Sequence, residues 1–263
     1  NLKYHESNAI FTKDGGTMYF TRNNGYKKVS YSSQKVNTLG IFKAVKKGDK
    51  WVDIEEVQLI PSNLKGYSVG HPALNAEESE LYFTSDMPGG EGKTDIYKVE
   101  IFNNGSYSGI KNLGPTINTP GKEMFPFVSN SNILYFSSDY HNGFGGLDIF
   151  QIDQTTEKED KVQNLGMPVN SSMDDFGFLL DKQEKKGFFT SNRAEGKGDD
   201  DIYGFKKIPI IEKPCITVVN GVVKNAEDLQ PIASAIVSLM GADGLKVRDT
   251  LSDANGLFKF NTK

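Results

Sequence analysis

The stretch that decides the fold is Leu81–Tyr97, which reads Leu-Tyr-Phe-Thr-Ser-Asp-Met-Pro-Gly-Gly-Glu-Gly-Lys-Thr-Asp-Ile-Tyr. Its two ends carry aromatic and β-branched residues, which are typical of strands that are half buried on a sheet. The glycines between them favour a turn, because glycine adopts backbone conformations that other residues resist. The stretch therefore predicts a β-hairpin.

The same hairpin recurs along the chain with a fixed period. A phenylalanine in the first strand and an aromatic residue in the second serve as markers, and both recur every 53 residues: Phe83, Phe136 and Phe189, and Tyr97, Phe150 and Tyr203. A looser copy surrounds Phe20 and has a longer loop, Asn23–Leu39. A period that holds at two markers indicates a structural repeat.

Two further strands accompany each hairpin in the aligned repeats. One precedes it, at Ala9–Phe11, Pro72–Leu74, Pro126–Val128 and Phe178–Leu180, and one follows it, at Val57–Ile60, Ile110–Leu113 and Val162–Leu165. Repeated four-stranded units without intervening helical pattern predict an all-β fold, a β-propeller with four recognisable four-stranded blades. The last blade, Phe176–Lys207, has no fourth strand of its own.

Four blades are at the low limit for propellers, so we expect these four to belong to a larger propeller. The alternative is a ring closed by strand exchange between the two ends of the repeats. The blade junctions share a second marker, an asparagine followed five residues later by a polar residue: Asn1 and Glu6, Asn63 and Ser68, Asn118 and Glu123, Asn170 and Asp175.

The period stops after residue 207, and Pro209 and Pro214 mark a linker at residues 208–215. Residues 216–263 then predict a small β-sandwich, short for a complete one. Its expected strands are Ile216–Val223, Ile232–Leu239 and Gly256–Phe260.

Composition excludes several classes of protein. The 263 residues are 37% hydrophobic and carry a net charge of −4, with lysines scattered along the chain, so nucleic acid is not an expected partner. No apolar run is long enough to predict a membrane span. Cys215 is the single cysteine, which excludes an intrachain disulfide and a cysteine-cluster metal site.

One motif points to catalysis. Gly66-Tyr-Ser-Val-Gly70 matches the Gly-x-Ser-x-Gly elbow of serine hydrolases, in which a strand-to-helix turn exposes the nucleophile. A strand, not a helix, is expected after Ser68. The repeat alignment also places Ser68 at the junction position of Glu6, Glu123 and Asp175. We therefore interpret Ser68 as a generic polar residue and predict no enzymatic activity.

Acidic residues recur in every hairpin. Asp86, Asp139 and Asn192 end the first strand, and Asp95, Asp148 and Asp201 begin the second. Carboxylates beside glycine-rich loops could bind Ca²⁺, with Asp199–Asp201 as the strongest candidate. Because the acids repeat in each blade, we favour a structural role in which they accept hydrogen bonds from turn N–H groups.

The three histidines, His5, His71 and His141, lie at no metal-ligand spacing from one another. Phosphate-binding loops, dinucleotide fingerprints and Cys-x-x-Cys pairs are missing from the sequence. We predict no cofactor.

Three segments around the hairpin carry a family resemblance. Residues 1–207 resemble WD-like (TolB-type) propeller repeats at Gly70-His-Pro-Ala-Leu, at Ser85–Tyr97 and at Asn112-Leu-Gly-Pro-Thr-Ile-Asn. Residues 217–263 resemble a carboxypeptidase-regulatory-like module at Gly221-Val-Val, Pro231-Ile-Ala-Ser-Ala-Ile-Val-Ser-Leu and Ser252-Asp-Ala-Asn-Gly-Leu-Phe-Lys-Phe.

This order of modules is similar to that of PorE-like OmpA-family lipoproteins, which are associated with gliding and type IX secretion in Gram-negative bacteria. The resemblance implies a periplasmic location at the outer membrane and a non-catalytic scaffold whose partners are other envelope or secretion-system proteins. Peptidoglycan binding in that family belongs to an OmpA-type domain that is not among these residues, so we assign it to none of them.

Overall fold

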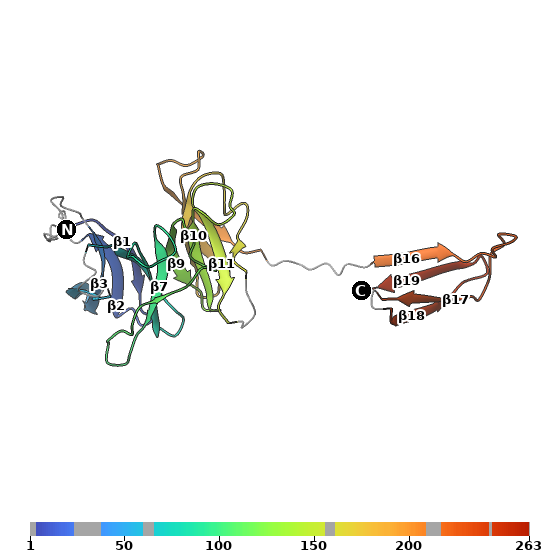
Figure 1. Ribbon diagram of the computed structural model, residues 1–263, viewed down its shortest axis with the longest axis horizontal. Helices are drawn as coiled ribbons and strands as arrows, with labels where there is room; N and C mark the ends of the chain where they lie inside the picture. Colours follow the sequence, from blue (N-terminus) through green and yellow to red (C-terminus); the bar gives the residue numbers. More distant parts are fainter. Residues whose placement is uncertain are drawn as a thin grey trace. The chain divides into compact units, whose positions relative to one another are not determined.

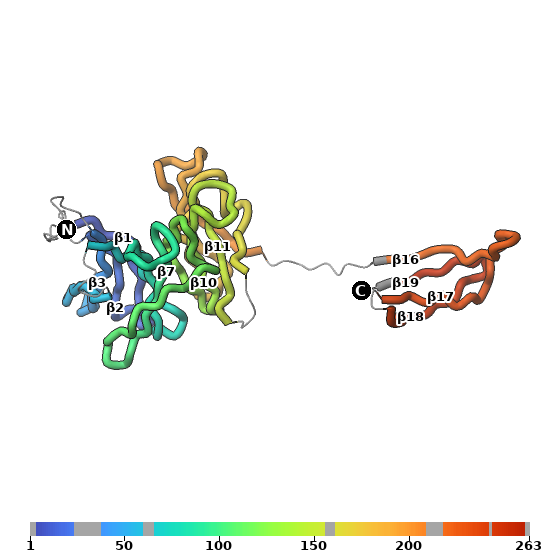
Figure 2. The backbone as a smooth tube through the Cα atoms, in the orientation of Figure 1, coloured from blue at the N-terminus to red at the C-terminus, as the bar shows by residue number. Residues whose placement is uncertain are grey.

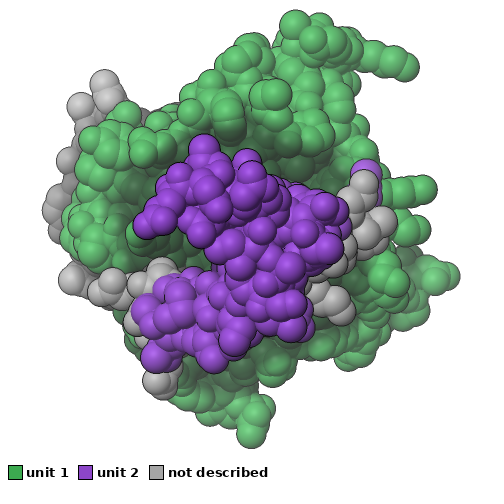
Figure 3. Space-filling view, turned by 90° about the vertical axis from the view of Figure 1, so that its right-hand side faces the viewer, with its two compact units in different colours: residues 1–207 green, residues 208–263 purple. Residues whose placement is uncertain are grey.

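The computed structural model describes residues 4–23, 38–59, 66–155, 161–208, 217–241 and 244–262. Contacts divide the chain into two compact units, residues 1–207 and residues 208–263, which Figure 3 colours separately. The described part of the chain contains strands and no helix, and therefore no helix that is long and apolar enough to cross a membrane. Of the linker expected at 208–215, only Ile208 lies within the described residues.

The first unit consists of four antiparallel sheets that follow one another along the chain, and we call them blades 1 to 4. Blade 1 contains β1 (Glu6–Phe11), β2 (Thr17–Asn23), β3 (Leu39–Lys47) and β4 (Lys50–Glu56). Blade 2 contains β5 (Val69–Leu74), β6 (Glu80–Ser85), β7 (Asp95–Glu100) and β8 (Lys111–Asn112).

Blade 3 contains β9 (Glu123–Val128), β10 (Ile133–Ser138), β11 (Asp148–Asp153) and β12 (Gln163–Asn164). Blade 4 has three strands among the described residues: β13 (Asp175–Leu180), β14 (Lys186–Ser191) and β15 (Asp201–Lys206).

The blades are arranged as a four-blade β-propeller, which confirms the predicted fold. In each blade the strands pair in chain order, so the first strand is one edge of the sheet. The first strand of each blade contacts that of the next: β1 contacts β5, β5 contacts β9, and β9 contacts β13. Figures 1 and 2 follow the chain through these blades from blue to orange.

The repeated phenylalanines occupy one register position. Phe20, Phe83, Phe136 and Phe189 lie in the second strands, are all at least 95% buried, and pair across the sheet with Phe42, Tyr97, Phe150 and Tyr203. The ring centroids of these pairs are 5.6–6.0 Å apart. This cross-strand aromatic pair is the repeated core element of the blade.

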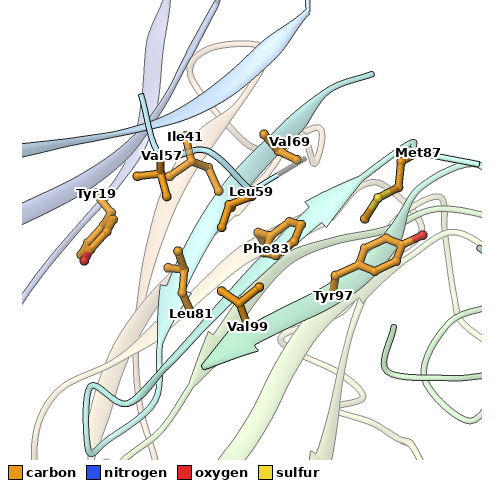
Figure 4. Close-up of a cluster of buried hydrophobic side chains, with 10 residues drawn as sticks. All are labelled: Tyr19, Ile41, Val57, Leu59, Val69, Leu81, Phe83, Met87, Tyr97 and Val99. Carbon is orange, nitrogen blue, oxygen red and sulfur yellow. The ribbon is translucent and has the colours of Figure 1, made fainter. Parts of the chain in front are cut away.

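The core lies between neighbouring blades. Phe83 of blade 2 packs in one buried cluster with Tyr19 and Ile41 of blade 1 (Figure 4). The same arrangement places Phe136 against blade 2 and Phe189 against blade 3. Blades 1, 2 and 3 therefore each bury one face against the phenylalanine of the blade that follows.

The outer strand of blade 1 differs from the prediction, which placed it at Val57–Ile60. The strand is β4, because Gly48, at φ +60°, makes a tight turn that pairs β4 directly with β3. The chain then bends and the Val57 N–H donates to the Ile41 carbonyl at 2.8 Å. The longer strands of this hairpin displaced the repeat alignment, and Ile60 itself lies outside the described residues.

The second unit contains two two-stranded antiparallel sheets. One pairs β16 (Thr217–Val222) with β19 (Leu257–Thr262), and the other pairs β17 (Ile236–Met240) with β18 (Lys246–Leu251). The sequence analysis did not predict β18, because its charged residues Lys246, Arg248 and Asp249 hide the strand pattern. Much of the strand surface in this unit is exposed.

We expect Phe189→Ala to lower the unfolding free energy of the propeller by about 3–5 kcal/mol, because it removes a buried ring and leaves a cavity. Phe188→Ala is the matched control on the same strand, since Phe188 is 57% exposed and Phe189 is 4% exposed. Urea unfolding followed by circular dichroism measures both. Equal losses in the two variants would contradict the assignment of Phe189 to the core.

Candidate functional site

The hairpin loops between the second and third strands of blades 2, 3 and 4 are each held by one aspartate. Asp95, Asp148 and Asp201 begin the third strands and accept hydrogen bonds from the backbone N–H groups four and three residues earlier. The donors are Glu91 and Gly92 at 2.6 and 3.1 Å, Phe144 and Gly145 at 2.8 and 3.0 Å, and Lys197 and Gly198 at 2.6 and 2.9 Å. The aspartates fix the loop backbone.

A glycine five residues before each aspartate makes this geometry possible. A Cβ at Gly90, Gly143 or Gly196 would overlap a carboxylate oxygen of the aspartate in the same loop. The sequence analysis did not single out these glycines, although they too recur every 53 residues. The loop motif is therefore a glycine and an aspartate separated by four residues.

A second set of side chains joins the end of each second strand to the start of the first. Asp86, Asp139 and Asn192 accept the backbone N–H of Ser68, Lys122 and Asp174 at 2.6, 2.7 and 2.8 Å. In blade 1 the Asn23 side chain accepts the His5 N–H at 3.0 Å. Asn23 is thus the fourth member of this set, which the sequence analysis missed because the long loop after it hid the pattern.

Buried acids occupy the junctions before blades 3 and 4. Glu123 accepts hydrogen bonds from the Thr119 N–H at 2.8 Å and from the Ser138 hydroxyl at 2.7 Å. Asp175 accepts the Ser171 N–H at 2.6 Å and forms an ion pair with Arg193, also at 2.6 Å. Burial raises the pKa of Glu123.

The junction asparagines complete the edge of the preceding blade. The Asn118 side chain accepts the Ile96 N–H at 2.8 Å and donates to the Ile96 carbonyl at 3.0 Å. Asn170 makes the same two bonds with Ile149, both at 2.8 Å. Each asparagine therefore replaces one residue of an outer strand. The corresponding Asn1 and Asn63 lie outside the described residues.

The structure corrects the alignment of Ser68. Glu123 and Asp175 pair with Ser138 and Ser191, and Glu6 pairs with Arg22, but the residue that pairs with Ser85 is Val69. Ser68 therefore lies one residue before the position of Glu6, Glu123 and Asp175. An alignment that matches only the polarity of a side chain does not detect a shift of one residue.

Ser68 does not have the surroundings of a nucleophile elbow. Strand β5 follows it directly, and its hydroxyl oxygen accepts the Leu39 N–H at 3.2 Å. No hydrogen bond joins Ser68 to a histidine among the described residues, and His71 uses its Nδ1 to accept the Phe125 N–H at 3.3 Å. His141 Nε2 lies 2.9 Å from the Ile117 carbonyl oxygen.

The first strands of the four blades line an apolar cavity of about 240 Å³. At its wall the ring of His71 stacks on Phe125 with a centroid distance of 4.0 Å, and Phe125 lies 4.9 Å from Phe176. Burial lowers the pKa of His71 to about 4, so the ring is neutral at pH 7. The rings of His71 and Phe125 are nearly parallel, with an interplanar angle of 12°, whereas those of Phe125 and Phe176 are tilted by 33°.

This cavity is shaped by a repeated backbone irregularity. Asn8, His71, Phe125 and Gly177 all have positive φ, between 48° and 65°, and each lies where the pairing of its first strand with the second strand shifts register. Such bulges turn a strand locally and change where its side chains point.

Among the described residues, no group of three or more histidine, cysteine, aspartate or glutamate side chains is arranged to hold a metal ion. Asp199 and Asp200, the neighbours of Asp201 in the candidate Ca²⁺ cluster, are exposed. One oxygen of Asp201 already accepts two backbone N–H groups.

Blades 2 and 3 differ at one carboxylate oxygen. In blade 2 the Asn112 amide donates to Asp95 at 2.9 Å, whereas in blade 3 the Asn164 amide donates to the Asn142 carbonyl at 3.3 Å. Both loop N–H groups of blade 3 donate to Asp148 Oδ2, so Asp148 Oδ1 is buried without a hydrogen-bond partner, whereas Asp95 Oδ1 accepts the Gly92 N–H. Burial raises the pKa of Asp148.

No protein-family model matches the chain, and no curated protein is similar to it. Among solved structures, a puromycin-hydrolysing peptidase of Mycobacterium tuberculosis is 13% identical with a TM-score of 0.47, and the match covers 78% of this chain and 30% of the peptidase. A putative TolB from Agrobacterium tumefaciens is 13% identical with a TM-score of 0.45, over 97% of this chain and 73% of that protein.

Prolyl oligopeptidase B from Galerina marginata is 12% identical with a TM-score of 0.46, over 75% of this chain and 26% of the enzyme. The chain thus spans less than a third of either peptidase. With TM-scores of 0.45–0.47 and identities of 12–13%, these matches assign no activity to the chain.

We expect Asp148→Asn to leave the stability at pH 7 unchanged or higher, because one side-chain oxygen can still accept the loop N–H groups. Since burial raises the folded pKa of Asp148, its protonated form stabilises the fold at low pH, and this contribution is lost as pH rises through that pKa. The advantage of the variant over the wild type should therefore shrink from pH 7 towards pH 4.

Asp95→Asn is the matched control, because both oxygens of Asp95 accept hydrogen bonds. Its unfolding free energy at pH 7 should be lower than that of the wild type by about 1–3 kcal/mol. Urea unfolding of the two variants between pH 4 and pH 8 measures the difference. If Asp148→Asn lowers the unfolding free energy at pH 7 as much as Asp95→Asn does, the unpaired oxygen of Asp148 has no effect on stability.

We also expect the melting temperature to be the same in excess EDTA and in millimolar CaCl₂. In each loop the backbone N–H groups already occupy one or both oxygens of the aspartate, and the described residues form no cluster of three or more possible ligands. A tightly bound ion would stabilise the folded state by mass action. Differential scanning fluorimetry measures the effect. If EDTA lowers the melting temperature clearly and CaCl₂ restores it, the aspartates bind Ca²⁺ and the purely structural interpretation is wrong.

Proposed function

We propose that this chain is a non-catalytic protein-interaction scaffold of a Gram-negative cell envelope. The observation that supports it is a constant loop backbone that carries different side chains. We call Asp95, Asp148 and Asp201 the bracing aspartates. The residue four positions earlier is Glu91 in blade 2, Phe144 in blade 3 and Lys197 in blade 4, and each donates the same backbone hydrogen bond. Such loops can vary in what they recognise while the blades hold them in place.

Blade 3 presents the side chains that suit a protein partner. Phe144 is 54% exposed and Tyr140 is 61% exposed, and both lie in the loop held by Asp148. The Tyr140 N–H donates to the Ser138 hydroxyl at 3.1 Å, which fixes the start of the loop. Exposed aromatic side chains on a fixed backbone lose little conformational freedom on binding and often anchor interfaces.

The envelope location rests on the resemblance to PorE-like OmpA-family lipoproteins and on the carboxypeptidase-regulatory-like pattern of residues 217–263. Under this proposal the chain is periplasmic, associated with the outer membrane, and contacts other envelope or type IX secretion proteins. Peptidoglycan contact would belong to the OmpA-type domain of that family.

A carbohydrate-binding propeller is the second candidate. The stacked rings of His71 and Phe125 at the wall of the cavity favour it, because the apolar face of a sugar ring packs on aromatic rings. A serine hydrolase has less support, since the Ser68 hydroxyl accepts a backbone N–H and a strand follows it.

We expect the immobilised chain to recover protein partners from envelope extracts, and Phe144→Ser to reduce this recovery about tenfold or more, as loss of an interface anchor does. Phe102→Ser is the matched control, because Phe102 is 46% exposed in a turn outside the hairpin loops. Ser68→Ala should recover the same partners as the wild type. Quantitative mass spectrometry of the eluted proteins measures all three.

Two results would count against the scaffold role. One is an eluate that contains glycan and no protein, which would favour the carbohydrate-binding alternative. The other is esterase activity of the wild type that Ser68→Ala abolishes.

A further inference from the structure

Blade 4 exposes a position that the other blades bury completely. Ile202 in β15 corresponds by register to Ile41, Ile96 and Ile149 in the third strands of blades 1, 2 and 3. These three isoleucines are 0% exposed, whereas Ile202 is 77% exposed. The same residue type is thus retained at a position where the described residues provide no cover.

The neighbouring strand shows the same contrast. Phe188 in β14 corresponds to Tyr19, Tyr82 and Tyr135, which are 7%, 1% and 1% exposed, but Phe188 is 57% exposed. Leu179 of β13, which pairs with Phe188, is 48% exposed. Together Leu179, Phe188 and Ile202 form an apolar face, which we call the open face of blade 4.

The outer edge of blade 4 is open as well. Blades 1 to 3 each have a fourth strand, and in the described part of the chain blade 4 has none. In blade 3 the Ile149 N–H and carbonyl bond to Asn170, and Gln151 pairs with Gln163 of β12. Ile202 and Gly204 present the corresponding backbone groups of β15, and an edge of this kind can pair with another strand.

Blades 2 and 3 show which segment fits such an edge. After β12 the chain places Leu165 and Val169 against the cluster that contains Ile149, and Asn170 pairs with the Ile149 backbone. After β8, Leu113 and Ile117 do the same for the cluster of Ile96. Both segments read Asn-Leu-Gly, two further residues, then Val or Ile followed by Asn. One short segment therefore both hydrogen-bonds to the backbone at the edge and covers the apolar side chains beside it.

We propose that the open face and outer edge of blade 4 bind an extended segment of a separate polypeptide that carries this Asn-Leu-Gly-x-x-(Val or Ile)-Asn pattern. The segment adds a fourth strand to β15, its leucine and its Val or Ile cover Ile202, and its last asparagine pairs with the Ile202 backbone. Strand addition of this kind derives affinity from main-chain hydrogen bonds and specificity from side-chain pockets. The inference rests on the proposed scaffold role and names one docking surface for it.

Blade 1 of a second copy is a poorer occupant. Its outward face carries the pair Phe20 and Phe42, and Phe20 is only 5% exposed. The Arg22 guanidinium lies over the Phe42 ring at 5.1 Å and over the Tyr4 ring at 3.6 Å. Stacking of blade 4 on this face would have to bury or displace that charge.

The test uses a fluorescein-labelled peptide with the sequence of residues 161–171, titrated with the full chain and followed by fluorescence anisotropy. We expect saturable binding with a Kd below about 1 mM. Peptides carrying Leu165→Ser or Asn170→Ala should bind at least tenfold more weakly. Ile202→Asp in the protein should weaken binding to the same degree, whereas Ile54→Asp should not, since Ile54 is 51% exposed on β4 of blade 1.

Circular dichroism and the melting temperature establish that both protein variants fold. Absence of saturable binding, or equal affinity for the Ile202→Asp protein, would overturn the proposal. So would concentration-dependent self-association that Ile202→Asp abolishes in analytical ultracentrifugation, because the occupant would then be a second copy. If the peptide fails to bind but envelope proteins are still recovered through Phe144, this docking surface is wrong and the scaffold role remains.

Discussion

The packing of each blade against the next is the interaction on which the propeller depends. A single four-stranded sheet cannot bury both of its faces by itself. Here the isoleucine and tyrosine of one blade are covered by the phenylalanine of the following one. Burial of this area supplies most of the folding free energy. The same dependence makes the last blade in the series different, because its Ile202 has the side chain for that contact and no described neighbour.

Carboxylate and amide side chains provide hydrogen-bond partners for backbone groups that the strands leave unpaired. Loops at the ends of short strands contain backbone N–H groups that no strand can pair, and such groups are costly when buried. Asp95 and Asp148 take up these groups within a loop, while Asn118 and Asn170 do so between successive blades. The polar residues that looked like ligands in the sequence thus act mainly on their own backbone.

The sequence was sufficient to predict the features that repeat with a constant spacing. The 53-residue spacing placed Phe83, Phe136 and Phe189 in equivalent strands, because a repeated core contact needs the same residue at the same distance. It was not sufficient where a segment changes length. The β3–β4 hairpin displaced the predicted outer strand of blade 1, and the alignment chose Ser68 over Val69 because it matched polarity and could not see strand register.

The bracing aspartate has a consequence for how such a protein can change over time. Its hydrogen bonds within the loop are made to backbone N–H groups, so they do not depend on the side chain at the tip. In blades 2 and 3 the end of the loop near the third strand is also bonded to the following blade, at Lys93 and Gly121 and at Gly146 and Met173. Glu91, Phe144 and Lys197 already occupy one such tip position. Mutation can therefore vary each tip independently, and selection for a new contact at one loop leaves the others free to keep the old ones.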